Sequence, residues 1–230
     1  MRRASRELFD VLETFARKGR HPVRDLLAAP PNALAHYPAG DVQDSATGSI
    51  WYYHAHERDW IEHGHFHCFL YTELVRPGAQ PIALPENPDF DKGGLVHLIA
   101  LCFAASGVPT RLFTVNRWAS DEWMYSAEDV VPLIDRFEFV GNTRFVLTSR
   151  LLTATLRVLY PQVAWALYER DRVLDERRRV DPEGFSEDQS FNVTSVVDFN
   201  LDDHLVALDR AWHRATGRVR SKGRTLSMDS

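Results

Sequence analysis

Five of the ten histidines in this 230-residue chain fall within the stretch WYYHAHERDWIEHGHFHCFLY, residues 51–71. Four of them form two His-x-His pairs, His54/His56 and His65/His67, and His63 extends the second pair. Imidazole binds Zn, Cu, Fe and Ni in its neutral form, which predominates at neutral pH for a histidine with the ordinary pKa of about 6.5. The residue types and their spacing therefore predict a site for a transition-metal ion.

Strand-like sequence around these histidines indicates how they would be positioned. Residues 49–56 and 64–74 are rich in Tyr, Phe, Trp and Leu, and alternate side chains of a strand point to the same face. We expect two adjacent antiparallel strands. A register that sets His56 opposite His65 also sets His54 opposite His67, and in that register four imidazoles share one face. The eight-residue connection ERDWIEHG does not fix this register, and a slip of one residue would separate the pairs.

Nearby carboxylates and one further histidine could complete the site. Glu57 and Glu62 are candidate general bases, and Asp59 and Glu73 are further candidates for a ligand or a hydrogen-bond acceptor. His97 lies in the apolar run GLVHLIAL and could join the metal site only if its strand is a neighbour of the histidine strands. Considered alone, it is better explained as a hydrogen-bonded histidine of the core. The scattered histidines are interpreted as structural or solvated: His21, His36, His204 and His213.

Three functions are consistent with the histidine cluster. The first is a metal-binding protein, possibly catalytic as a metal-dependent hydrolase or oxygen-using enzyme with an open coordination position. Its metal would be Zn, Fe or Cu, with His54, His56, His65 and His67 as ligands and His63 and His97 as second candidates. The second is a non-enzymatic protein that binds metal or heme, because heme needs only one or two axial imidazoles. The third is a scaffold with a polar histidine cluster and no ligand.

Composition argues against several other classes of protein. The formal net charge of −5 and a pI near 6.1 are unlike those of a protein that binds nucleic acid. No apolar run approaches the roughly 18 residues of a membrane-spanning helix, and the N-terminus lacks the features of a secretory signal. Cys68 and Cys102 lie in apolar runs and are interpreted as buried thiols in a reducing compartment. We expect a cytoplasmic protein whose partner is a small molecule or metal ion; its oligomeric state stays open.

The pattern of elements predicts one α+β domain over residues 1–230, with an antiparallel sheet of about five strands packed against C-terminal helices. The expected order is N-terminal helices over 1–30 (3–18 and a short one at 22–27), a loop to residue 48, β-hairpins over 48–118, helices over 126–180, a strand and helix over 190–216, and a flexible tail over 217–230. Phe66, Cys68 and Leu70 alternate with the histidines. We expect these three to pack against helices drawn from residues 143–176.

Two further segments carry information about family and site. The strand EHGHFHCF, with the following HLIAL and RLFTVNRW, resembles a family of functionally uncharacterised bacterial proteins that share an HGHFH strand. The resemblance implies a bacterial origin and a single shared domain, and brings no activity with it. In VNRWASDEW, residues 115–123, Asn116, Arg117, Asp121 and Glu122 follow a predicted strand. We interpret them as an Arg–carboxylate pair that caps a hairpin, with contact to a substrate as the alternative.

Overall fold

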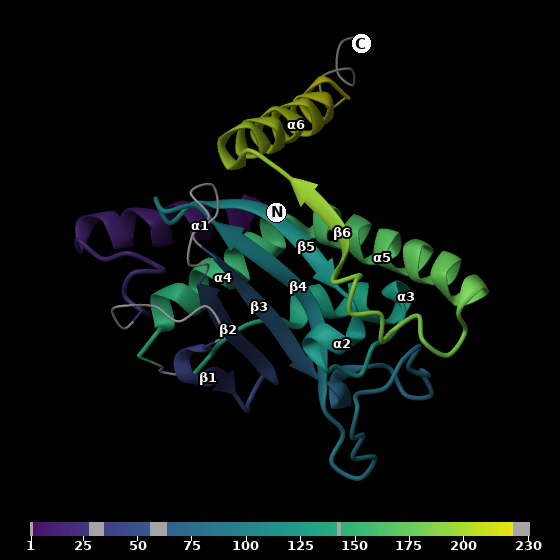
Figure 1. Cartoon of the computed structure of the whole chain (residues 1–230). Coiled ribbons are helices and arrows are strands. Elements are labelled where there is room, and N and C mark those ends of the chain that lie inside the picture. Colours follow the sequence, from purple (N-terminus) through teal and green to yellow (C-terminus); the bar gives the residue numbers. More distant parts are fainter. Residues whose placement is uncertain (1, 28–34, 56–63, 142–143, 223–230) are drawn as a thin grey trace.

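The computed structural model describes residues 2–27, 35–55, 64–141 and 144–222, which form one six-stranded sheet and the helices packed on it (Figure 1). The strands are β1 (Tyr37–Asp44), β2 (Ser49–Ala55), β3 (Gly64–Tyr71), β4 (Leu95–Phe103), β5 (Pro109–Val115) and β6 (Val193–Asp198). They lie in the sheet in this order, and every neighbouring pair is antiparallel. The predicted α+β class is confirmed, with six strands in place of about five.

Six α-helices and two 3-10 helices accompany this sheet in the part of the chain that the structure describes. They are α1 (Arg2–Arg17), α2 (Arg117–Ser120), α3 (Ala127–Val130), α4 (Val146–Val158), α5 (Tyr160–Val180) and α6 (Leu201–Lys222), with 3-10 helices η1 (Thr72–Leu74) and η2 (Val131–Arg136). In Figure 1, α4 and α5 pass behind the sheet, whereas α6 projects away from it at the top. The opposite face, which carries the histidines, is turned toward the viewer and also bears α2, whose Ala119 packs against the apolar cluster that includes Ala100 and Phe113.

The main core lies between the sheet and these helices. Phe66, Cys68 and Leu70 of β3 are each 0% exposed and belong to one apolar cluster with Leu151 of α4 and Leu167 of α5. Burial of large apolar side chains from both layers is the principal force that holds a sheet and its helices together. The prediction that these three residues face a helical layer is confirmed.

The sixth strand, β1, occupies a segment that we expected to be a loop. Pro38 and Gly40 weaken its strand signal, and most of its central residues are not buried. Such residues are tolerated here because β1 is an edge strand that pairs only with β2, and its register shifts between Tyr37 and Val42. Edge position and irregular pairing therefore explain why composition did not identify it.

Two further boundaries differ from expectation. Residues 22–26 form turns and no second N-terminal helix, because Nδ1 of His21 accepts hydrogen bonds from the backbone N–H groups of Val23 and Arg24, both at 3.1 Å. The closing helix continues past residue 216 to Lys222, so the first part of the expected flexible tail is helical. The rest of that tail, residues 223–230, lies outside the described residues.

A buried hydrogen bond joins β2 to α4 and leads to a prediction. Nε1 of Trp51 donates to Oγ of Ser149 at 2.9 Å, and both residues are 0% exposed. Ser149→Ala should lower the free energy of unfolding by about 1–3 kcal/mol, because the indole N–H would lose its acceptor inside the core. Urea unfolding of the variant and the wild type measures this difference.

Thr153 of the same helix supplies the matched control. Its Oγ1 is buried and has no hydrogen-bond partner in the part of the chain that the structure describes. Thr153→Val keeps the shape of the side chain and removes an unsatisfied hydroxyl, so its effect should be neutral or stabilising. Equal losses of stability in the two variants would contradict the role given to the Trp51–Ser149 hydrogen bond.

Candidate functional site

The histidine pairs are brought together by the pairing of β2 with β3. The two strands are adjacent and antiparallel as predicted, with His54 opposite His65 and Tyr52 opposite His67. The pairing of His54 with His67 that we considered, with His56 opposite His65, therefore differs from the observed register by two positions. A shift of two residues leaves every side chain on its own face, so the expected common face of the histidines is preserved.

Packing on the helix side explains the observed register. The large indole of Trp51 lies opposite the small Cys68, and the rings of Tyr53 and Phe66, which are also opposite each other, have centroids 4.7 Å apart. In the register that we considered, Trp51 would face Leu70, and Tyr53 would face Cys68. The register is thus set by the fit of large and small side chains along both strands, which a long connection cannot specify.

Three imidazoles form a compact triangle on the other face. Ring centroids are 5.7 Å apart for His54 and His65, 5.6 Å for His54 and His67, and 4.7 Å for His65 and His67. His54 and His65 are half-buried, whereas His67 is 5% exposed. Phe113 of β5 contacts the His65 ring edge-on at 5.0 Å and so adds an apolar wall. The triangle has the size at which three nitrogens can converge on one ion after small ring rotations.

His97 joins the triangle because of an irregularity between β3 and β4. The register shifts between Cys68 and Phe69, so that Cys68 pairs with Ile99 and Phe69 pairs with His97. This bulge places His97 on the histidine face, where its Nε2 lies 3.0 Å from Nδ1 of His67. His97 is 2% exposed. It is therefore a buried, hydrogen-bonded histidine, as expected for it alone, and also a neighbour of the cluster.

Hydrogen bonds determine which nitrogens of the two buried rings carry protons. Burial lowers the pKa of His97, and the interaction of its ring with the Ile99 backbone, which opposes this shift, is the one expected of a ring N–H that faces a carbonyl oxygen. Nε2 of His97 is then left as an acceptor for the Nδ1–H of His67. In this assignment, which follows from the partners of each ring, Nε2 of His67 holds a lone pair. A metal ion requires a nitrogen in that form.

Burial keeps both rings neutral. Loss of solvation lowers the pKa of His67 well below the ordinary value, and repulsion by His97, His65 and His54 lowers it further. For His97, burial lowers the pKa to about 3, and the positive charge of Arg170 acts in the same direction. At neutral pH the centre of the cluster is thus uncharged, which favours binding of a cation.

Glu122 holds β4 in place beside the cluster. Its Oε2 accepts the backbone N–H of His97 at 2.7 Å, and its Oε1 accepts from Oγ of Ser120 at 3.2 Å. Burial raises the pKa of Glu122 to about 7. Nearby, Nη1 of Arg117 donates to Asp121 at 2.8 Å, which is the capping pair expected at the end of this hairpin. The VNRWASDEW segment therefore supports the histidine face through the backbone.

His36 and Tyr52 also contribute to this face, although we interpreted His36 as a scattered histidine. The rings of His36 and Tyr52 are stacked with centroids 3.7 Å apart, and His36 meets His54 edge-on at 4.9 Å. Nδ1 of His36 lies 2.9 Å from Oδ1 of Asp41. No spacing rule could have found His36, because it lies in an irregular segment before the edge strand.

Several predicted residues cannot be placed or lie elsewhere. His56, His63, Glu57, Asp59 and Glu62 fall outside the described residues. Glu73 of η1 is exposed, and Cys68 and Cys102 are buried thiols as expected, with no disulfide among the described residues. Across the described ranges, no group of three or more His, Cys, Asp or Glu side chains is already arranged to hold a metal ion. The triangle is therefore a set of neighbouring rings that must turn before they can act as ligands.

Acidification should destabilise the protein through His67 and His97. Both pKa values are lower in the folded chain than in the unfolded one, so below about pH 6.5 the unfolded chain binds more protons. As pH falls from there, each histidine lowers the free energy of unfolding by about 1.4 kcal/mol per pH unit, until the pH reaches its pKa in the folded chain. Glu122 acts oppositely, because its raised pKa favours the folded chain below pH 4.5 and this contribution is lost as pH rises through about 7.

The net effect is measurable by urea unfolding at about pH 6.5 and about pH 5. Burial also lowers the pKa of His21, so this residue acts in the same direction as His67 and His97. The histidine protons therefore outnumber the one carboxyl proton, and the wild type should lose at least about 1.4 kcal/mol of unfolding free energy per pH unit. His97→Gln removes one titrating ring. The free energy of unfolding of this variant should therefore fall by about 1.4 kcal/mol less per pH unit than that of the wild type over the same range. The same acid sensitivity in both proteins would contradict the neutral, buried state of His97.

Comparison with known proteins adds a family but no activity. Residues 2–199 match the model of a family described as a domain of unknown function (DUF6969), and this match ends just before α6. No curated protein and no solved structure matches the chain. In the described residues, no helix has the length and apolar character needed to cross a membrane. Any role for the histidine face has to be argued from its own chemistry.

Proposed function

The chain belongs to the DUF6969 family, and we propose that it binds a divalent transition-metal ion through His54, His65 and His67. The carrying observation is the triangle of rings on one sheet face, with centroids 4.7–5.7 Å apart. Three imidazoles are a recurrent protein ligand set for zinc and leave a fourth position for water or substrate. Packed aromatic rings around the triangle would limit access of bulk water and strengthen binding.

His97 has a supporting role in this proposal. Ligating histidines usually donate their second N–H to a neighbouring acceptor, which fixes the ring and its tautomer. Nε2 of His97 is that acceptor for His67, and Glu122 holds the backbone of His97 in turn. The chain from Glu122 through His97 to His67 therefore orients the one ligand that is fully buried.

The sequence offers further groups for the remaining coordination position and for catalysis. His56 and His63 are candidates for a fourth ligand, and Glu57 and Glu62 are candidates for a general base. A site closed by four protein ligands would be structural or would store metal, whereas an open position would suit a metal-dependent hydrolase or an oxygen-using enzyme. A nitrogen-rich set favours Zn, Fe or Cu. The proposed setting is the reducing cytoplasm of a bacterium, where Cys68 and Cys102 stay reduced thiols.

Elemental analysis of protein purified without a histidine tag tests the proposal, together with thermal unfolding with and without a chelator. We expect about one metal ion per chain and a lower melting temperature after chelation, because an ion that binds only the folded state stabilises it. A visible absorption spectrum distinguishes heme, the alternative ligand. Absence of metal together with a melting temperature that the chelator does not change would leave the scaffold interpretation.

A further inference from the structure

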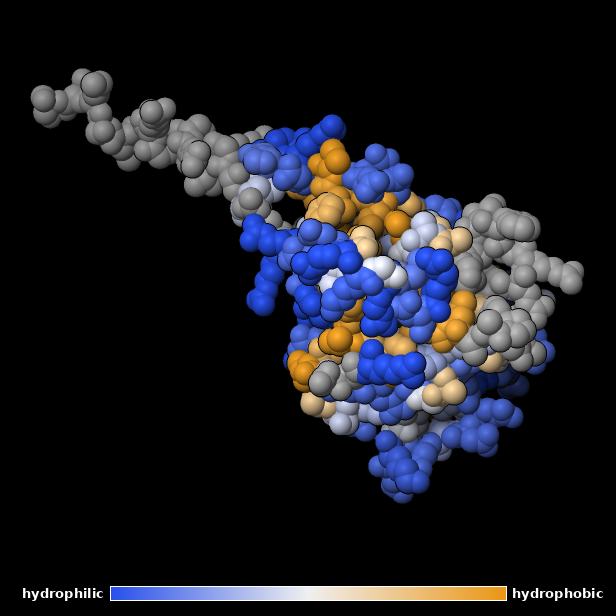
Figure 2. All heavy atoms as spheres, turned by 90° about the vertical axis from the view of Figure 1, so that its left-hand side faces the viewer, coloured by the Kyte–Doolittle hydropathy of each residue, from blue (hydrophilic) through white to orange (hydrophobic). Residues whose placement is uncertain are grey.

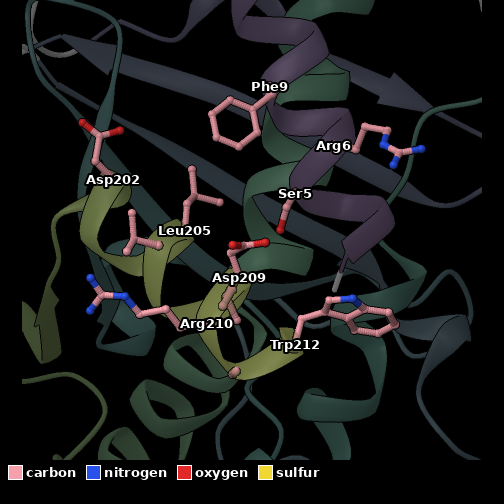
Figure 3. Close-up of a pocket in the computed structure, with 11 residues that line it drawn as sticks. Ser5, Arg6, Phe9, Asp202, Leu205, Asp209, Arg210 and Trp212 are labelled. Atoms are coloured by element: carbon pink, nitrogen blue, oxygen red, sulfur yellow. The ribbon is translucent and has the colours of Figure 1, made fainter. Parts of the chain in front are cut away.

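A second feature of the chain lies away from the histidines, at the junction of α1 and α6. A groove of about 930 Å³ runs between these helices, with an apolar floor that includes Phe9, Leu205 and Trp212 (Figure 3). Charged residues lie along its rim, among them Asp202 and Arg210 on α6. Figure 2 shows apolar surface gathered on the side of the molecule where α1 lies. An apolar floor with a charged rim is the usual anatomy of a protein interface.

Exposure of large side chains marks this groove as an interaction surface. Phe9 is 55% exposed, Val206 49% and Trp212 41%. Phe9 belongs to α1 and the other two belong to α6, so they line both walls of one groove. Contiguous exposed apolar residues on two packed helices are costly in water and are typical of a surface that another element covers.

The sequence of α6 identifies a helix as the covering element. Leu201, Leu205, Leu208 and Trp212 are spaced by four, three and four residues, which is the a/d pattern of a coiled-coil seam. Leu201 and Leu205 are buried against the body of the protein at 5% and 8% exposure, whereas Trp212 is largely exposed. The seam thus continues along α6 beyond the part that the body covers.

Charge identifies the partner as a second copy of α6. The first half of the helix, residues 201–211, carries Asp202, Asp203 and Asp209 against the single Arg210, and the second half carries Arg214 and no acidic residue. The sequence of residues 215–222 adds three more basic residues and no acidic one. Parallel copies would place like charges together, whereas antiparallel copies place the acidic half of each helix beside the basic half of the other.

We propose that α6 of a second copy of this chain occupies the groove, antiparallel to the resident α6, to form a symmetric dimer. Such an arrangement is isologous, because each copy uses the same groove and the same helix. It buries Phe9, Val206 and Trp212 of both chains at once and pairs their charged rims. The proposal does not rest on metal binding, because the groove and the histidine face are formed by different elements.

Hydrodynamic mass measured across a dilution series tests the dimer, and Trp212→Ala tests its position. The wild type should show twice the chain mass of 26.4 kDa at high concentration and dissociate on dilution. Trp212→Ala should raise the dimer dissociation constant by roughly tenfold or more, as for a central interface tryptophan. Trp165 of α5 is 53% exposed and is not part of the groove, so Trp165→Ala is the matched control and should leave dissociation unchanged.

A charge exchange tests the antiparallel orientation. One variant carries Asp202→Arg and Asp203→Arg, which makes the first half of the helix basic. The other carries Arg214→Glu, Arg218→Glu and Arg220→Glu, which makes the second half acidic. Each alone should be monomeric where the wild type is dimeric, because the facing halves then repel. An equimolar mixture should form a heterodimer, because the basic first half of one helix faces the acidic second half of the other.

Three results would overturn the proposal. The first is a wild-type protein that stays monomeric at its highest soluble concentration. If the groove of this monomer also takes up an apolar dye, it is an open ligand-binding site. Another is a dimer whose dissociation does not respond to Trp212→Ala, which would place the interface elsewhere. The third is that the two charge variants fail to associate when mixed, although circular dichroism shows that each variant keeps its helices.

Discussion

His67→Ala is expected to remove stoichiometric metal from the protein, whereas His97→Ala should only weaken metal binding. His67 is the most buried ring of the triangle, and without it a water molecule would have to take a ligand position. His97→Ala should lower the metal affinity by roughly 10–100-fold, which is typical for a residue that orients a ligand through a hydrogen bond. The loss of metal affinity in His67→Ala should be larger. His65→Ala should resemble His67→Ala. Elemental analysis and metal titration of the three variants measure these differences.

The control is His213→Ala. Its side chain is 70% exposed and lies on α6, apart from the sheet, so metal content should stay unchanged. If the cluster were only structural, His67→Ala would leave Nε2 of His97 without its donor. Unfolding would then become easier by about 1–3 kcal/mol with or without chelator. Such a chelator-independent loss, with no metal in the wild type, would contradict the metal site.

Gly64→Ala should destabilise the protein by about 3 kcal/mol or more and disrupt the histidine face with it. Gly64 begins β3 with φ at +155°, a conformation that side-chain-bearing residues rarely adopt. An added Cβ would overlap the carbonyl oxygen of His54 and lie 2.5 Å from Oη of Tyr53. The first pairs of the β2–β3 ladder would have to separate, next to the place where His54 faces His65. Urea unfolding and metal content both report the change.

Gly78→Ala separates the two causes of this effect. Gly78 has φ at +83° but nothing within 4 Å of an added Cβ, so only the backbone conformation penalises the substitution. Its cost should be about 1–2 kcal/mol, with no loss of metal. Similar destabilisation by both substitutions would show that close packing at Gly64 contributes little.

Local patterns predicted most elements that carry the site. Aromatic composition identified β2 and β3, and an apolar run followed by turn residues identified β4 and β5. Period-two alternation placed His54, His65 and His67 on one face and Phe66 on the other. Helical spacing identified α1, α4, α5 and α6. Each of these signals lies within a single segment and depends only on which side chains must be buried.

The features that were missed depend on contacts between segments. The register of β2 against β3 follows from Trp51 meeting Cys68 across the strands, which no turn motif encodes. His36 reaches the site from an irregular segment through its stack on Tyr52. Glu122 takes part because a loop returns to the end of β4. Sequence spacing does not contain such distances, so these residues had no recognisable signal.

The extra residue of β4 opposite the Cys68–Phe69 step decides which face of the sheet His97 occupies. Ahead of it, β3 and β4 pair with residue numbers that add to 167, as for Cys68 and Ile99; beyond it the sum is 166, as for Phe69 and His97. Without the one-residue offset, His97 would stand opposite Leu70 and point into the core beneath the helices. Regular pairing at the present chain length would thus break the His67–His97 hydrogen bond although every histidine is kept. A relative that lacks one residue between His97 and Ile99 would instead pair regularly and still place His97 opposite Phe69.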